Sequence, residues 1–125
     1  MAKILIAEDD PALIRLYQNI MTMAGHEVET AENGQIALDK LPVFQPELLI
    51  LDLNMPKVNG VEVFVKLKSQ TNLENLPVLI LTNAYTESSA VEAKALGADD
   101  FLIKSSVEPE QLVEKVDEIL NREKE

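Results

Sequence analysis

The chain has 125 residues, with 22 acidic and 11 basic side chains, a formal charge of −11 and no cysteine. A chain of this length suits one domain that buries roughly two-thirds of its unfolded surface, and disulfides and thiolate metal sites are excluded. The negative charge opposes binding to nucleic acid and anionic lipid, and no apolar run approaches the roughly 20 residues of a membrane span. We expect residues 1–125 to form a single soluble, cytoplasmic domain that binds neither nucleic acid nor membranes directly.

The N-terminal region predicts a strand followed by a helix. Residues 4–7 are an apolar run of strand length, and residues 11–24 place their apolar side chains on one stripe at helical spacing. Asp10 is expected to cap this helix, with Pro11 at its first position and Gly25 at its end.

The next segments continue the alternation. Residues 26–31 alternate polar and apolar side chains, which predicts an edge strand with one face in water. Residues 34–41 fit a short helix, which Pro42 is expected to end. Residues 48–51 are four aliphatic side chains in a row, typical of a strand that is covered on both faces, and residues 60–68 fit a third helix.

The C-terminal part contains two more strand and helix pairs. Residues 78–81 and 101–103 are apolar runs, and the last helix is predicted over 108–122. Between them, residues 87–96 fit a helix ended by Gly97, but its apolar stripe is mostly alanine. Burial of apolar surface stabilises by about 25 cal/mol per Å², so a helix that buries so little should be the most loosely attached. We expect this helix to move.

This order of elements predicts the fold class. Strands that alternate with helices five times indicate an α/β fold, a doubly wound five-stranded parallel sheet with right-handed crossovers and helices on both faces. In such sheets, ligands bind outside the carboxyl ends of the strands.

Charged or hydroxyl-bearing side chains follow all four apolar strands. They are Glu8, Asp9 and Asp10 after the first strand, then Asp52, Thr82 and Lys104. Taken alone, an aspartate after a strand is usually a turn or cap residue, and Asp10 before Pro11 is better explained as a helix cap than as a ligand. In a parallel sheet, however, all of these residues reach the same edge.

A cluster of carboxylates at one edge of the sheet requires positive charge or protonation to offset the repulsion between them. Two carboxylates about 4 Å apart repel by roughly 4 kcal/mol at an effective dielectric of 20, and Lys104 supplies only one positive charge. Either protonation or a divalent cation can relieve the excess, and an all-oxygen site suits Mg²⁺ or Mn²⁺. A carboxylate such as Asp52 beside a metal, a lysine and the Thr82 hydroxyl also meets the requirements of phosphoryl transfer.

These motifs resemble the response-regulator receiver domain of bacterial two-component signalling. The matching residues are the pair Glu8 and Asp9, Asp52 followed by Asn54, Met55, Pro56 and then Gly60, and finally Thr82 and Lys104. The resemblance covers essentially the whole chain. It implies the flavodoxin-like strand order 2-1-3-4-5 for the sheet. It also implies that the protein is a signalling phosphoacceptor and not an enzyme, although it assists its own phosphorylation and dephosphorylation.

The resemblance also implies a role for each site residue. Asp52 would accept a phosphoryl group from a histidine kinase or phosphotransfer protein. Asp9, Asp52 and the main-chain carbonyl of Asn54 would bind Mg²⁺ directly, and Glu8 would act through water. Lys104 would bind a phosphoryl oxygen and Thr82 would donate a hydrogen bond to the phosphoryl group.

The same resemblance predicts a switch and a partner surface. Phe101 would follow Thr82 inward as the switching aromatic, although ordinary core packing also explains an aromatic there. Phosphorylation would change the partner-binding face around residues 83–108. A downstream protein would read the surface of helix 87–96, strand 100–103 and helix 108–122.

Two positions depart from the family pattern. Ser105 follows Lys104 where receiver domains usually have proline, commonly through a cis bond. A non-proline cis bond costs about 2.5–4 kcal/mol, so either the bond is trans and the loop differs or strain is retained. Asn83 stands beside Thr82 where the family favours a small residue, which predicts slow loss of the phosphoryl group.

Other functions fit these residues less well than a receiver domain does. An aspartyl-phosphate phosphohydrolase of the haloacid dehalogenase type would have a second aspartate two residues after the nucleophile, where this chain has Asn54. A flavodoxin-like FMN protein would share the sheet, but the acidic turn after the first strand would repel the flavin phosphate. A receiver-like interaction module that is not regulated by phosphorylation stays an alternative because of Ser105.

Overall fold

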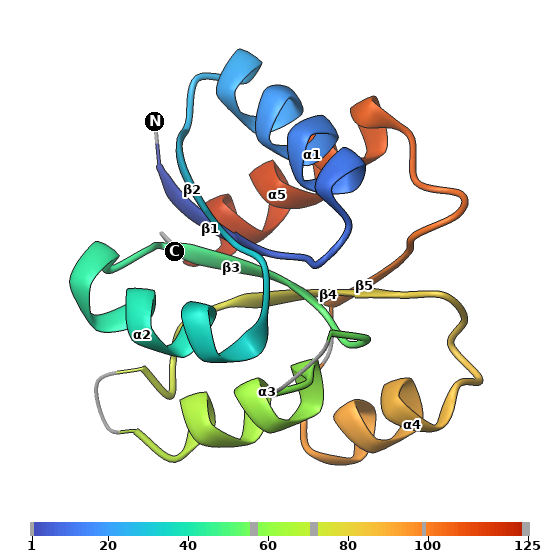
Figure 1. Ribbon diagram of the computed structural model, residues 1–125. Helices are drawn as coiled ribbons and strands as arrows, with labels where there is room; N and C mark the ends of the chain where they lie inside the picture. Colours follow the sequence, from blue (N-terminus) through green and yellow to red (C-terminus); the bar gives the residue numbers. More distant parts are fainter. Residues whose placement is uncertain (1, 56–57, 71–72, 99, 124–125) are drawn as a thin grey trace.

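The computed structural model describes residues 2–55, 58–70, 73–98 and 100–123. Within them, strands and helices alternate along the chain as predicted (Figure 1). The elements are β1 (Lys3–Ala7), α1 (Pro11–Met23), β2 (Glu27–Ala31), α2 (Gly34–Phe44), β3 (Leu48–Asp52), α3 (Gly60–Lys68), β4 (Val78–Thr82), α4 (Ser88–Ala95), β5 (Asp100–Ile103) and α5 (Pro109–Glu123).

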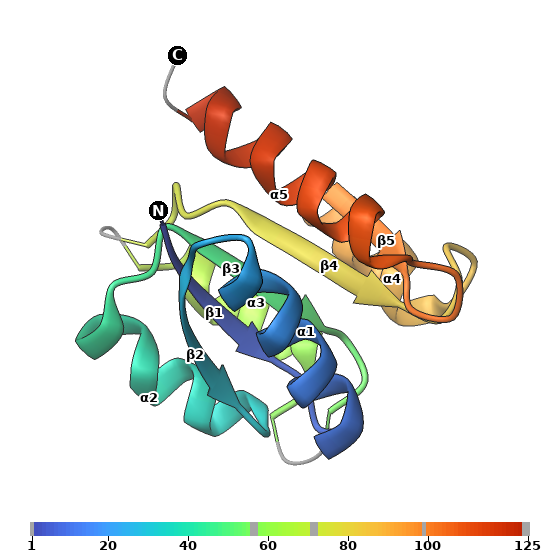
Figure 2. The same cartoon turned by 90° about the horizontal axis from the view of Figure 1, so that it is seen from above.

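The strands form one parallel sheet in the order β2-β1-β3-β4-β5. The central strand β3 is buried along its whole length, as its unbroken aliphatic run predicts, whereas the edge strand β2 alternates between exposed and covered residues. The predicted fold class and strand order are therefore confirmed. Because all strands run parallel, they end at the same edge of the sheet, and Figure 2 shows the arrowheads of β1 to β4 there.

Helices cover both faces of this sheet (Figure 1). On one face, Ile4 and Ile6 of β1 pack with α1 and α5, and on the other, Leu5 and Ala7 pack with α2, α3 and α4. The alternation follows from the pleat of a strand, which directs successive side chains to opposite faces. The pleat therefore decides which helices each residue at the end of a strand can approach.

The ends of α1 follow the predicted capping rules. Asp10 Oδ1 accepts hydrogen bonds from the amides of Ala12 at 2.9 Å and Leu13 at 3.4 Å. Pro11 opens the helix, and Gly25 adopts a left-handed φ of 94° just after it. Asp10 is thus a helix cap, as expected.

The predicted end of the second helix is wrong. Pro42 lies inside α2, which continues to Phe44, and Gln45 ends it with a left-handed φ of 53°. A proline so near the end removes only one helical hydrogen bond, and the Gln45 amide still donates to the carbonyl of Leu41 at 3.0 Å. Because Pro42 itself is exposed, its ring does not disturb the core.

Helix α4 is attached to the sheet by little apolar surface. Its buried residues are Ala90 and Ala93, and Glu87 at its N-cap makes no side-chain hydrogen bond to the helix. This agrees with the small buried area predicted from its alanine-rich stripe. In the described part of the chain, none of the helices has the length and apolar character of a membrane span.

Candidate functional site

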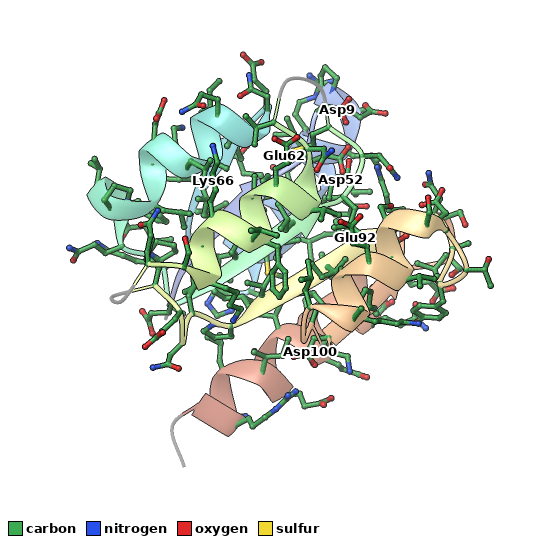
Figure 3. All side chains as sticks on the ribbon, turned by 90° about the horizontal axis from the view of Figure 1, so that it is seen from below. Asp9, Asp52, Glu62, Lys66, Glu92 and Asp100 are labelled. Carbon is green, nitrogen blue, oxygen red and sulfur yellow. The ribbon has the colours of Figure 1, made fainter. Side chains whose placement is uncertain are left out.

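The ends of four strands bring the predicted residues to one edge of the sheet. Hydrogen bonds continue the ladder beyond the strands, because the Glu8 amide donates to Ala31 O at 3.0 Å and the Lys104 amide donates to Thr82 O at 2.8 Å. Glu8 and Lys104, which lie just past their strands, are therefore still held by main-chain hydrogen bonds to the neighbouring strand. Figure 3 shows Asp9 and Asp52 at this edge.

Asp52 is the last residue of the buried strand β3 and is itself fully buried. The amide of Asn54 donates to its Oδ1 at 3.1 Å. Helix α3 begins directly against this turn, since the Gly60 amide donates to Leu53 O at 3.1 Å and a Cβ on Gly60 would collide with the backbone of Asp52 and Leu53. The lack of a side chain at Gly60 thus allows α3 to hold the turn after Asp52.

Lys104 links two buried carboxylates. Its Nζ lies 3.0 Å from Asp52 Oδ2, and it also lies 3.3 Å from Glu8 Oε1 and 3.2 Å from Glu8 Oε2. The pleat of the strands explains why the three side chains lie together. The residues two positions before them, Ile6, Ile50 and Leu102, belong to the core on the side of α1 and α5. Glu8, Asp52 and Lys104 therefore share that face.

Burial dominates the electrostatics of this group. It raises the pKa of Glu8 to about 7, and the charge of Asp52 adds to the effect. Burial also raises the pKa of Asp52, although the hydrogen bonds from Asn54 and Lys104 oppose it. For Lys104, burial lowers the pKa, but the hydrogen bond and charge of Asp52, together with Glu8, outweigh it and the pKa is raised. The single positive charge of Lys104 thus faces two buried acids, Glu8 and Asp52, and does not fully neutralise them.

The donor set fits a divalent cation. Carboxylate oxygens of Glu8, Asp9 and Asp52 lie within 4.8 Å of one another. Glu8 Oε2 is buried, and although it lies near Lys104 Nζ it has no hydrogen-bond partner among the described residues. An unsatisfied buried carboxylate oxygen beside two others is a site that a small, hard cation would relieve. The main-chain carbonyl of Asn54 as a further ligand stays a prediction.

Thr82 points toward the other face of the sheet. Val78 and Ile80, which precede it at alternate positions, pack on the side of α3 and α4. The Thr82 hydroxyl donates toward two acceptors, Ala84 O at 3.1 Å and Glu87 Oε2 at 3.2 Å. The predicted edge therefore has two sides, with Glu8, Asp52 and Lys104 on one and Thr82 on the other.

Phe101 is partly buried on the same side as Thr82. Its ring lies 6.3 Å from that of Tyr85 in an edge-on arrangement at 74°, and Lys94 Nζ lies 4.8 Å from the Tyr85 ring and 5.3 Å from the Phe101 ring. Phe101 thus joins α4 to the loop before it. Its predicted switching role stays a prediction.

The sequence alone did not identify Glu87 as part of the site. Its Oε2 also accepts a hydrogen bond from Asn54 Nδ2 at 3.3 Å, so it joins the loops after β3 and β4. In the sequence, Glu87 stands out only because it occupies the start of the helix predicted over 87–96, a position where Ser, Thr, Asp or Asn is the usual cap.

The bond after Lys104 is resolved in favour of the trans form. The described residues contain no cis peptide bond, so the Lys104–Ser105 bond is trans while Lys104 still reaches Asp52. Ser106 closes a turn by donating its amide to Ile103 O at 3.2 Å. Pro56, the remaining motif position, lies outside the described residues.

A flavodoxin-like parallel sheet with an acid cluster and a lysine at its carboxyl edge defines a class of α/β signalling domains, and comparisons with known proteins agree. The family model for the response regulator receiver domain matches residues 4–117. The chain is 37% identical over 124 residues to the phosphate regulon transcriptional regulatory protein PhoB of Rhizobium meliloti, covering 99% of this chain and 54% of PhoB. It is 35% identical over 120 residues to the alkaline phosphatase synthesis transcriptional regulatory protein PhoP of Bacillus subtilis, covering 96% and 49%.

Solved structures are similar over almost their full length. The chemotaxis response regulator CheY4 of Vibrio cholerae superposes with a TM-score of 0.87 at 32% identity, covering 95% of this chain and 98% of CheY4. A CheY-like receiver domain protein from Methanospirillum hungatei gives a TM-score of 0.90 at 27% identity, covering 99% and 97%.

The chain belongs to the response regulator receiver domain family. Receiver domains are signalling domains and not classical enzymes, and membership supports a phosphoacceptor role in two-component signalling. The chain spans about half the length of the curated relatives that it matches.

Proposed function

We propose that residues 1–125 form one receiver domain in which Asp52 accepts a phosphoryl group from the phosphohistidine of a histidine kinase or phosphotransfer protein. The observation that carries the proposal is the buried Asp52 carboxylate, which lies 3.0 Å from Lys104 Nζ beside the acid pair Glu8 and Asp9. Such an arrangement holds a nucleophile rigidly next to a cation, which is the main requirement of phosphoryl transfer.

In the proposed reaction, a carboxylate oxygen of Asp52 attacks the phosphorus atom. The phosphorus–nitrogen bond of the phosphohistidine breaks, the departing imidazole keeps the bonding electron pair, and an acyl phosphate forms on Asp52. Lys104 already contacts Asp52 Oδ2 and is placed to donate to an oxygen of the arriving phosphoryl group. The Asn54 amide holds the other carboxylate oxygen in position.

Glu8, Asp9, Asp52 and the main-chain carbonyl of Asn54 would hold Mg²⁺ or Mn²⁺, with Glu8 acting through water. The cation would neutralise negative charge on the phosphoryl oxygens during transfer. The unsatisfied Glu8 Oε2 and the raised pKa of Glu8, caused first by burial and then by Asp52, support a need for such a charge.

Phosphorylation is proposed to change the surface near α4. Formation of the acyl phosphate replaces the single negative charge of the Asp52 carboxylate with roughly two on the phosphoryl group and adds acceptor oxygens, which would draw the Thr82 hydroxyl toward Asp52 and Phe101 inward after it. Because α4 buries little apolar surface, it would shift most readily. A downstream protein would bind helix 87–96, strand 100–103 and helix 108–122, with no direct contact between this chain and nucleic acid.

Incubation with Mg²⁺ and a small acyl phosphate donor tests the proposal. Intact mass should show one added phosphoryl group in the unchanged protein and none in Asp52→Asn. Asp100→Asn is a matched control, because Asp100 is a buried acid that pairs with Arg122 at the far end of β5, and it should be phosphorylated normally. No added mass on the unchanged protein, or an added phosphoryl group that persists in Asp52→Asn, contradicts the assignment.

The alternatives receive less support. A phosphohydrolase would need a general acid two residues after the nucleophile, and Asn54 instead offers an amide that donates to Glu87. Ser105 is the residue that favours a module that is never phosphorylated, but the trans bond before it leaves the contact of Lys104 with Asp52 intact.

A further inference from the structure

Glu87 directs its carboxylate away from its own helix and toward the site. It precedes α4 as the N-cap residue, yet its side chain makes no hydrogen bond to the helix. One oxygen, Oε2, instead accepts from Thr82 Oγ1 at 3.2 Å and from Asn54 Nδ2 at 3.3 Å. A single carboxylate oxygen therefore connects β4, the loop after β3 and the start of α4.

This contact uses a hydrogen bond that the proposed phosphorylated state also needs. A threonine hydroxyl has one proton to donate, and in this structure Ala84 O and Glu87 Oε2 share it. A phosphoryl group on Asp52 would add a third acceptor. The charge of Glu87 would also repel a group that carries roughly two negative charges. Thr82 therefore cannot serve both partners fully at once.

We infer that Glu87 is a positioning residue that competes with the phosphoryl group for the Thr82 hydroxyl and ties the start of α4 to the unphosphorylated arrangement. The inference rests on the proposed function of Asp52. Because Glu87 immediately precedes Ser88, the first residue of α4, releasing Thr82 also removes one of the contacts that hold the start of that helix. The contact thus links phosphorylation of Asp52 to α4, whose buried residues are only alanines.

The competition predicts tighter binding of a phosphoryl mimic when Glu87 is changed. Beryllofluoride with Mg²⁺ is the probe, because it reports an equilibrium and not a transfer rate. Glu87→Ala removes both the acceptor and the charge and should bind the probe about threefold to tenfold more tightly, the effect of losing one or two modest competing hydrogen bonds. Glu87→Gln keeps an acceptor without the charge and should give a smaller gain.

Glu92→Ala is the matched control. Glu92, which is labelled in Figure 3, is an exposed acid of α4 and lines the same surface depression as Asn54. Removing it changes the net charge equally and should alter probe affinity less than twofold. In a Thr82→Val background, Glu87→Ala should give little further gain, because the hydroxyl for which Glu87 competes is gone.

Two results would overturn the inference while leaving the proposed function intact. One is a Glu87→Ala affinity no higher than that of Glu92→Ala, and the other is an equal gain with and without the Thr82 hydroxyl. Failure of the unchanged protein to take a phosphoryl group from an acyl phosphate donor would instead overturn the proposed function, and this inference with it.

Discussion

Replacing Glu8 by glutamine should stabilise the metal-free protein. The folded chain raises the pKa of Glu8 from 4.5 to about 7, mainly through burial and secondly through the charge of Asp52. At about 1.36 kcal/mol for each pKa unit, the difference of about 2.5 corresponds to about 3 kcal/mol at pH 8, where Glu8 is ionised in both states. Because a real pocket relaxes and admits water, this figure is an upper bound for the gain in Glu8→Gln.

The gain should depend on pH with a definite sign. The unfolded chain releases the Glu8 proton near pH 4.5 and the folded chain near pH 7, so the favourable contribution of protonated Glu8 is complete below pH 4.5 and is lost as the pH rises through 7. Glutamine has no such loss. The advantage of Glu8→Gln should therefore shrink from at most about 3 kcal/mol at pH 8 to about 1 kcal/mol at pH 5.

Urea unfolding with a chelator present, at pH 8 and pH 5, measures both values. Glu27→Gln, at an exposed position on the edge strand β2, controls for the change in net charge. Adding Mg²⁺ at pH 8 should then stabilise the unchanged protein more than Glu8→Gln. If Glu8→Gln is no more stable than the unchanged protein at pH 8, Glu8 does not lie in a pocket whose negative charge is under-neutralised.

Three further changes have defined outcomes. Gly60→Ala should lose about 2 kcal/mol or more in urea unfolding, because its Cβ would strike the backbone after Asp52; an unchanged midpoint would contradict this. Tyr17→Phe should gain about 1 kcal/mol in the same assay, since the Tyr17 hydroxyl is buried without a hydrogen-bond partner in the described residues, and a loss of stability would show that the hydroxyl is satisfied in solution. Asn83→Ala should shorten the lifetime of the acyl phosphate, followed by intact mass after donor removal, and an equal lifetime would reject the idea that Asn83 restricts hydrolysis.

Local rules explain why most elements could be predicted. The Asp10 and Pro11 pair specifies a helix start through hydrogen bonds within three residues. The aliphatic run 48–51 is buried because it lies in a central strand of a sheet whose two faces are both covered by helices. Pro42 shows the limit of such rules. Near the end of a helix its missing amide removes only one bond, so the chain could continue to Phe44.

The division of the site between two faces could not be predicted in the same way. Asp52 lies opposite Leu81 in the sheet, so Thr82 is one residue further along and points to the other face. Thr82 in turn lies opposite Ile103, so Lys104 is one residue further along and points back to the face of Asp52. Strand register sets these directions, and the sequence predicted only that the residues share an edge. Glu87 was missed because the path of the loop after Thr82 follows no periodic pattern.

Locating the phosphoryl group on the chain tests most directly whether Asp52 is its acceptor. After incubation with Mg²⁺ and an acyl phosphate donor, borohydride reduction converts an aspartyl phosphate to homoserine, and peptide mass mapping identifies the changed residue. We expect conversion at position 52 alone, dependent on both donor and Mg²⁺. Conversion at another aspartate, or none at Asp52 in a protein that carries the added phosphoryl mass, would contradict it.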